Sequence, residues 1–167
     1  GIANGLHIGG GDVTVRAMTI NRFQGHGIHV QVADPLANGS TRASLTVEGC
    51  WIGLTADGLS AAGNTGSGIS LNQDNGSASS RIGGRGSEDG NVISGNGGSG
   101  ISFTARDSAD YYEFTASGVV MEQNFVGTNR HGLAKVPNGG NGIDVTWESN
   151  YDQWPAGSVI IGGPGTS

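Results

Sequence analysis

Lysine and cysteine are almost missing from this chain. Lys135 is the only lysine among 167 residues, and the formal net charge is −6 at pH 7. Proteins that bind nucleic acids need a basic face to neutralise phosphates, so this charge balance argues against a nucleic-acid partner. Cys50 is the single cysteine, which excludes an internal disulfide. Because it lies in an apolar stretch, we expect a buried, unreactive thiol.

Long apolar runs are also missing. No stretch is long and apolar enough to cross a bilayer as a helix, so the sequence predicts no membrane insertion. Glycine, by contrast, supplies 33 residues, which is about one residue in five against an ordinary share of about 7%. Such a composition often marks disorder, but the regularly spaced Ile, Val, Leu and Phe residues indicate a packed core.

A short phrase recurs along the chain and sets its period. The phrase Gly-x-Gly-Ile, followed by a polar and then an apolar residue, occurs at 25–30, 66–71, 98–103 and 140–145, and a weaker copy occurs at 3–8. Its apolar anchors are Leu6, Ile28, Ile69, Ile101 and Ile143. A second phrase at 47–58 matches 121–132 with an offset of 74 residues, so long and short units alternate. Self-similarity at this scale is typical of a solenoid.

The apolar pattern within each unit predicts strands. Val13-Thr14-Val15 and Leu45-Thr46-Val47 alternate with period 2, and the Gly and Asn residues between such segments would break helices. We therefore predict an all-β parallel β-helix of about five coils, one domain over 1–167, with longer loops on alternate coils. Stacking would place the Ile anchors in one inward column, and would place in one outward row His7, His29, Ser70, Ser102 and Asp144.

Several quoted phrases resemble a known family of repeats. Ile82-Gly83-Gly84 followed by Gly90-Asn91-Val92-Ile93-Ser94-Gly95-Asn96, together with the segments 51–58 and 125–128, is similar to the right-handed parallel β-helix repeats of large bacterial secreted and surface proteins. The resemblance implies a right-handed coil and the fold of the pectate-lyase-like superfamily. It departs at Gly49-Cys50, where the family has Gly-Asn, so an asparagine ladder there would be interrupted. The superfamily includes lyases, hydrolases, tailspikes and adhesins, so the fold does not decide the function.

Candidate catalytic and metal-binding residues have simpler interpretations. The Gly-His-Gly around His26 resembles a motif of polygalacturonase-type hydrolases, but the same turn carries Ser or Asn in other copies, so we assign no catalytic residue. His7 and His29 should stack about 5 Å apart, which could hold a transition metal, but no third ligand is evident and a solvated row is favoured. Asp57-Gly58, Asp74-Asn75-Gly76 and Glu88-Asp89-Gly90 look like fragments of calcium loops and are explained as turns. Calcium stays an open alternative, the metal content is unknown, and no other cofactor is expected.

Two segments after the anchors Ile101 and Ile143 combine aromatic and acidic residues. Such residues can bind sugar rings or anchor a protein partner, they can fold a long loop onto the core, or they can supply catalytic carboxylates. The candidate ligand-binding residues are Asp110, Tyr111, Tyr112, Trp147, Glu148, Tyr151, Asp152 and Trp154.

These observations favour a non-enzymatic structural or binding segment of a bacterial extracellular or cell-surface protein, with a polysaccharide or a protein as its partner. One alternative is a fragment of a carbohydrate-active enzyme, a lyase or a hydrolase, that uses the region of Asp110, Glu148 and Asp152. Another is a fibre subunit that self-associates end to end. Because the repeat pattern is open at both ends and no polar cap is visible, we expect the chain to be a segment of a longer repeat protein.

Overall fold

The computed structural model of the chain describes residues 2–31, 43–74, 79–107, 118–149 and 158–163. These residues form β-strands, turns and bends, and no helix occurs among them. All strand pairs within the sheets are parallel, and every third strand returns to the same sheet. The prediction of an all-β parallel solenoid is therefore confirmed.

The strands form three sheets that we name A, B and C. Sheet A contains β1 (Leu6–Ile8), β4 (Ile28–Gln31), β7 (Ile69–Asp74), β10 (Ile101–Asp107) and β13 (Ile143–Ser149). Sheet B contains β2 (Gly11–Arg16), β5 (Ala43–Glu48), β8 (Ser80–Gly83), β11 (Gly118–Glu122) and β14 (Ser158–Ile161). Sheet C contains β3 (Thr19–Ile20), β6 (Trp51–Ile52), β9 (Val92–Ile93) and β12 (Phe125–Val126).

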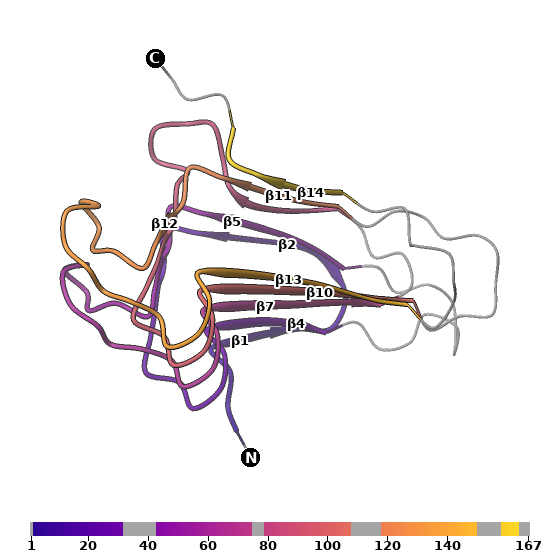
Figure 1. Cartoon of the computed structure of the whole chain (residues 1–167), viewed down its shortest axis with the longest axis horizontal. Helices are drawn as coiled ribbons and strands as arrows, with labels where there is room; N and C mark the ends of the chain where they lie inside the picture. Colours follow the sequence, from indigo (N-terminus) through magenta and orange to yellow (C-terminus); the bar gives the residue numbers. More distant parts are fainter. Residues whose placement is uncertain (1, 32–42, 75–78, 108–117, 150–157, 164–167) are drawn as a thin grey trace.

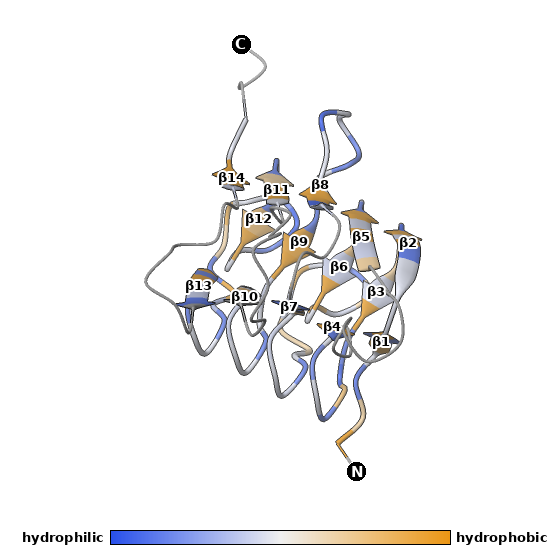
Figure 2. Ribbon diagram, turned by 90° about the vertical axis from the view of Figure 1, so that its right-hand side faces the viewer, coloured by the Kyte–Doolittle hydropathy of each residue, from blue (hydrophilic) through white to orange (hydrophobic). Residues whose placement is uncertain are grey.

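One coil of the solenoid takes one strand from each sheet. Figure 1 shows sheets A and B as two layers, and Figure 2 shows the strands side by side in the order of the coils, with sheet C between the other two sheets in that view. The architecture is that of a right-handed β-helix-like solenoid of about five coils. Because the anchors of successive coils pair with each other, the number of residues between two copies of the repeated phrase equals the number of residues in one coil.

The inward column of sheet A has the predicted register. Ile28 pairs with Leu6 and Ile69, and Ile101 pairs with Ile69 and Ile143. The three central isoleucines are fully buried, and each such side chain contributes roughly 1.5–3 kcal/mol by leaving water. The nearest-neighbour stacking of these anchors is therefore a main source of stability.

The outward row of sheet A is also in register, but it is not uniformly solvated. His7 is exposed and His29, Ser102 and Asp144 are half-buried, whereas Ser70 is only 5% exposed. Ser70 pairs with His29 on one side and with Ser102 on the other. The flanking residues of the two adjacent coils thus restrict the access of water to this short side chain.

A buried asparagine ladder holds the turns that lead from sheet C towards sheet A. The Nδ2 of Asn64 donates to Oδ1 of Asn96 at 2.9 Å, and the Nδ2 of Asn96 donates to Oδ1 of Asn138 at 3.1 Å. Asn96 Nδ2 also donates to the carbonyl of Ile52 at 3.1 Å, one coil below. The side-chain amides of Asn64 and Asn96 thus each donate both to a backbone carbonyl and to the asparagine of the next coil. These hydrogen bonds compensate the cost of burying the polar groups.

The connections between sheets B and C contain a second ladder that Cys50 interrupts. Asn91 Nδ2 donates to Asn124 Oδ1 at 2.9 Å and to the carbonyl of Val47 at 2.9 Å. Cys50 occupies the next rung, where its Sγ lies 3.7 Å from the carbonyl of Val15. Burial raises the pKa of the Cys50 thiol, so the thiol stays protonated and acts as a weak donor. The predicted buried thiol and broken ladder are both confirmed.

Replacing Asn96 by alanine should lower the free energy of unfolding by about 3 kcal/mol, because it leaves buried carbonyl and amide groups of the neighbouring turns without partners. Urea unfolding monitored by circular dichroism measures this change. Asn141→Ala is the matched control, since the exposed Asn141 side chain lies outside the ladder, and its effect should stay within about 0.5 kcal/mol. Equal effects of the two substitutions would contradict a structural role for the ladder.

Restoring the broken rung should stabilise the protein. In Cys50→Asn, the new amide can donate to the carbonyl of Val15 as Asn91 does to Val47, so we expect a gain of about 1 kcal/mol in the free energy of unfolding. Cys50→Ala removes the thiol without adding an amide and should lower it instead. If both variants were less stable than the parent chain in the same urea experiment, position 50 would not accommodate an asparagine in the ladder.

Candidate functional site

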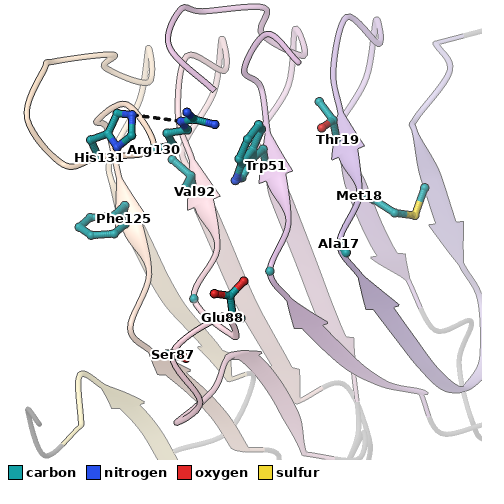
Figure 3. A pocket seen from close by; sticks show the side chains of 12 residues that line it. Ala17, Met18, Thr19, Trp51, Ser87, Glu88, Val92, Phe125, Arg130 and His131 are labelled. Atoms are coloured by element: carbon teal, nitrogen blue, oxygen red, sulfur yellow. Dashed lines mark hydrogen bonds between the residues drawn. The ribbon is translucent and has the colours of Figure 1, made fainter. Parts of the chain in front are cut away.

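The outer face of sheet C carries a groove of about 550 Å³. Figure 3 shows its lining side chains, which come from successive coils and form a row along the axis of the solenoid. The lining residues are Ala17, Met18, Thr19, Gly49, Trp51, Ser87, Glu88, Gly90, Val92, Phe125, Arg130 and His131. The site is thus built from one residue of each sheet C strand and from the loops at both edges.

The floor of the groove follows from the alternation within two-residue strands. Trp51 pairs in register with Thr19 and Val92, and Val92 pairs with Phe125. The residues that follow them, such as Ile52 and Ile93, are fully buried in the core, so the first residue of each strand points outward. Neighbouring rungs lie about 4.8 Å apart, which places Trp51 and Phe125 roughly 10 Å apart along the groove.

Two equivalent loops follow strands of sheet C, and the second of them supplies Arg130 and His131 to the edge of the groove. Residues 53–62 follow β6 and residues 127–136 follow β12, and each loop closes with an isolated antiparallel bridge, Leu54 with Ala61 and Thr128 with Lys135. Each loop turns at a glycine with positive φ, Gly58 at 69° and Gly132 at 70°. The offset of 74 residues and the longer loops on alternate coils, both predicted from the sequence, are thereby confirmed.

A small apolar cluster anchors these loops to sheet C. Leu54 and Val136, one from each loop, are buried against Val92, and Trp51 packs beside them half-buried. Because this cluster lies outside the main core, the loops have their own attachment to the floor. The edge of the groove is consequently held in place by side-chain packing as well as by backbone bridges.

Arg130 joins the two loops to the floor of the groove. Its backbone amide donates to the carbonyl of Gly58 at 3.0 Å, and its guanidinium carbon lies 5.5 Å from the centroid of the Trp51 ring, a cation–π contact. Its Nε donates to Nε2 of His131 at 3.1 Å. A Cβ at Gly58 would lie 2.9 Å from Cδ of Arg130, so glycine there permits the close approach.

The opposite edge consists of the turn at residues 84–90. The carboxylate of Asp89 accepts a hydrogen bond from the amide of Gly86 at 2.8 Å, and the carbonyl of Asp89 accepts one from Gly49 at 3.0 Å. Glu88 is exposed beside this turn. Figure 3 shows Glu88 and Ser87 at one edge of the row and Arg130 and His131 at the other, so the two edges carry opposite charge.

The turn interpretation of Asp57-Gly58 agrees with the structure. Oδ1 of Asp57 accepts hydrogen bonds from the hydroxyl of Thr55 and from the amide of Leu59. The Thr55 hydroxyl and then the Leu59 amide lower the pKa of the Asp57 carboxyl. Within the described ranges, no three His, Cys, Asp or Glu residues are grouped so that they could hold a metal ion; Asn75 and Gly76 of the second fragment lie outside those ranges.

Two of the eight predicted ligand-binding residues are described, and both lie in β13. Trp147 packs partly buried against the main core, with its ring edge against Phe103 at a centroid distance of 5.6 Å. Glu148 is exposed on the same strand. The remaining six, Asp110, Tyr111, Tyr112, Tyr151, Asp152 and Trp154, lie outside the described residues. Ligand binding in this region therefore stays a prediction.

Trp51 and Phe125, the two aromatic residues of the groove, were not predicted as site residues from the sequence. Both occupy the same place in the phrases offset by 74 residues, and each precedes an aliphatic residue of its own strand, Ile52 or Val126. Applying the alternation rule to these short strands would have placed both rings on the outer face. Their proximity to the 84–90 turn, however, depends on the packing of the coils.

Comparison with known proteins assigns the chain to no family. No protein-family model matches the chain, and neither a curated protein nor a solved structure matches it. Among the residues that the structure describes, no helix is long and apolar enough to cross a membrane. The fold itself defines the class, which is a parallel β-helix solenoid with a groove on its third sheet.

Proposed function

We propose that this chain is a non-enzymatic binding segment of a bacterial extracellular or cell-surface β-helix protein, and that the groove on sheet C holds an extended glycan. The observation that carries the proposal is the in-register row of Thr19, Trp51, Val92 and Phe125 on the floor. Phe125 is 48% exposed, which is a large apolar ring offered to solvent rather than to the core.

The chemistry of the groove fits a sugar chain. A pyranose ring has apolar C–H faces and hydroxyl groups around its edge, and aromatic rings with polar neighbours complement both. The rings of Trp51 and Phe125 supply the apolar surface, while Thr19, Glu88 and Arg130 supply donors and acceptors at the floor and edges.

The shape of the groove favours a polymer over a small molecule. The lining residues come from successive coils, so the groove runs along the axis of the solenoid. The separation of roughly 10 Å between the rungs of Trp51 and Phe125 is about the length of two sugar units in an extended chain. A glycan could therefore place alternate units on the two rings.

Removing either ring should weaken glycan binding. We expect Trp51→Ala and Phe125→Ala each to raise the Kd of a glycan selected from an array by at least about tenfold, because each removes a stacking surface. Isothermal titration calorimetry with that glycan measures the change. Leu133→Ala is the matched control, since Leu133 is 89% exposed and does not line the groove, and its Kd should not change.

Further measurements on the same purified protein distinguish glycan binding in the groove from the three other possibilities. Binding that is lost in Tyr151→Ala and Asp152→Ala but not in the groove variants would place the ligand on the predicted aromatic loops instead. Release of reducing ends or of unsaturated products, abolished by Asp110→Ala or Asp152→Ala, would show that the chain is a carbohydrate-active enzyme. Fibres in electron micrographs, without glycan binding, would favour the self-assembling alternative.

A further inference from the structure

Three of the four histidines form a cluster at the first two coils. The rings of His7 and His29 are 5.5 Å apart between centroids, as the register of β1 and β4 requires, and the rings of His26 and His29 are stacked at 5.1 Å. His26 precedes β4 in the turn at 25–27, which explains why it reaches the same face as His29. We name His7, His26 and His29 the imidazole stack.

His26 bonds the imidazole stack to the third coil in a way that requires a neutral ring. Its Nδ1 accepts a hydrogen bond from the amide of Ser67 at 3.0 Å. A nitrogen that accepts from an amide must keep its lone pair, so the proton of His26 resides on Nε2. Protonation of Nδ1 would replace this hydrogen bond by two opposed N–H groups.

Among the described residues, His29 has a hydrogen-bond partner for only one of its two ring nitrogens. Its Nε2 is 3.2 Å from Oε1 of Gln31, whereas its Nδ1 is buried and has no hydrogen-bond partner among the described residues. A proton on Nδ1 would therefore lack an acceptor there and would face the adjacent His26 ring at close range. Two charged imidazoles at this separation would repel each other.

No described carboxylate compensates such a charge through an ion pair. Arg16–Glu48, Arg81–Glu122 and Arg85–Glu122 are ion pairs between described residues, and none of them includes a histidine. The groups that lie against the imidazole stack are neutral: Asn4 before β1, Gln31 on β4, and Ser67 and Ser70 at the third coil. The nearest charged residue along the chain, Arg22, is exposed. Asp144 belongs to the same row but lies three coils from His29, about 14 Å away, which exceeds the screening length of roughly 8 Å at physiological salt.

We propose that the imidazole stack is an acid-sensitive joint, which holds the first three coils together at neutral pH and loosens them when the histidines become protonated. Burial, and then the neighbouring His29, lower the pKa of His26 below its ordinary value of 6.5. The folded chain therefore binds fewer protons than the unfolded chain as the pH falls through 6.5, so the free energy of unfolding decreases with falling pH until the lower folded pKa is passed.

Hydrogen exchange of single backbone amides tests this joint. The reporters are Leu6, whose amide donates to Gly27, and Ser67, whose amide donates to His26; the reference is Phe125, whose amide donates to Asn91 in a distant coil. Between about pH 7.5 and about pH 5, the protection factors of both reporters should fall at least about tenfold, while that of Phe125 should change by less than about twofold.

The residues at equivalent positions of other coils indicate which substitutions of the histidines the fold should tolerate. His26→Ser and His29→Ser copy Ser67 and Ser70 of the next coil, and His26→Asn copies Asn141, so each substitution uses a residue that the same slot already holds. In the double variant His26→Ser/His29→Ser the fall in protection of Leu6 should shrink to less than about threefold. His131→Ser, which removes the histidine outside the imidazole stack, should retain the full response.

Three results would overturn the joint. They are unchanged protection in the parent chain at the lower pH, a full loss of protection that persists in the double variant, or a response that disappears in His131→Ser. His26→Asn serves as the second test where the serine variants do not fold, because its asparagine adds no group that titrates in this range.

Discussion

The parallel backbone pairing of successive coils is the constraint on which the rest of this structure depends. Each residue in a strand has a fixed partner above and below, so every side chain meets its equivalent from the neighbouring coil. Identical residues therefore meet identical residues: isoleucines form the inward columns, and asparagines form the ladders of the turns. A side chain fits such a slot when it can pack or bond with the residues at the same position of the neighbouring coils.

The same constraint shows how the fold accommodates a residue that differs from its equivalents in the other coils. Cys50 replaces an asparagine rung without breaking the turn because its thiol still reaches a carbonyl of the coil below. His26 and His29 occupy slots that hold serine in the following coil, and they stack where serines would not. The scaffold thus accepts different chemistry at single positions while the backbone geometry stays the same.

Much of the fold could be predicted from the sequence because the repeat signal is local and redundant. The anchor spacing predicted the register of Ile28, Ile69 and Ile101, and the match of the phrase at 47–58 to that at 121–132 predicted that the loops after β6 and β12 are equivalent. The groove was not predicted, because it needs the packing of those loops and of the 84–90 turn against sheet C. The stacking of His26 on His29 was missed for a similar reason, since a turn residue and a strand residue meet only when the direction of the turn is known.

The alternation of long and short coils has a consequence for polymer recognition. The loops at 53–62 and 127–136 recur on every second coil, so equivalent loops lie about 10 Å apart along the axis. A rigid array of equivalent contacts raises the effective concentration of each contact once the first has formed. A solenoid that repeats this design could therefore combine weak individual contacts into strong avidity for a long chain, with the number of coils setting the length of ligand that is favoured.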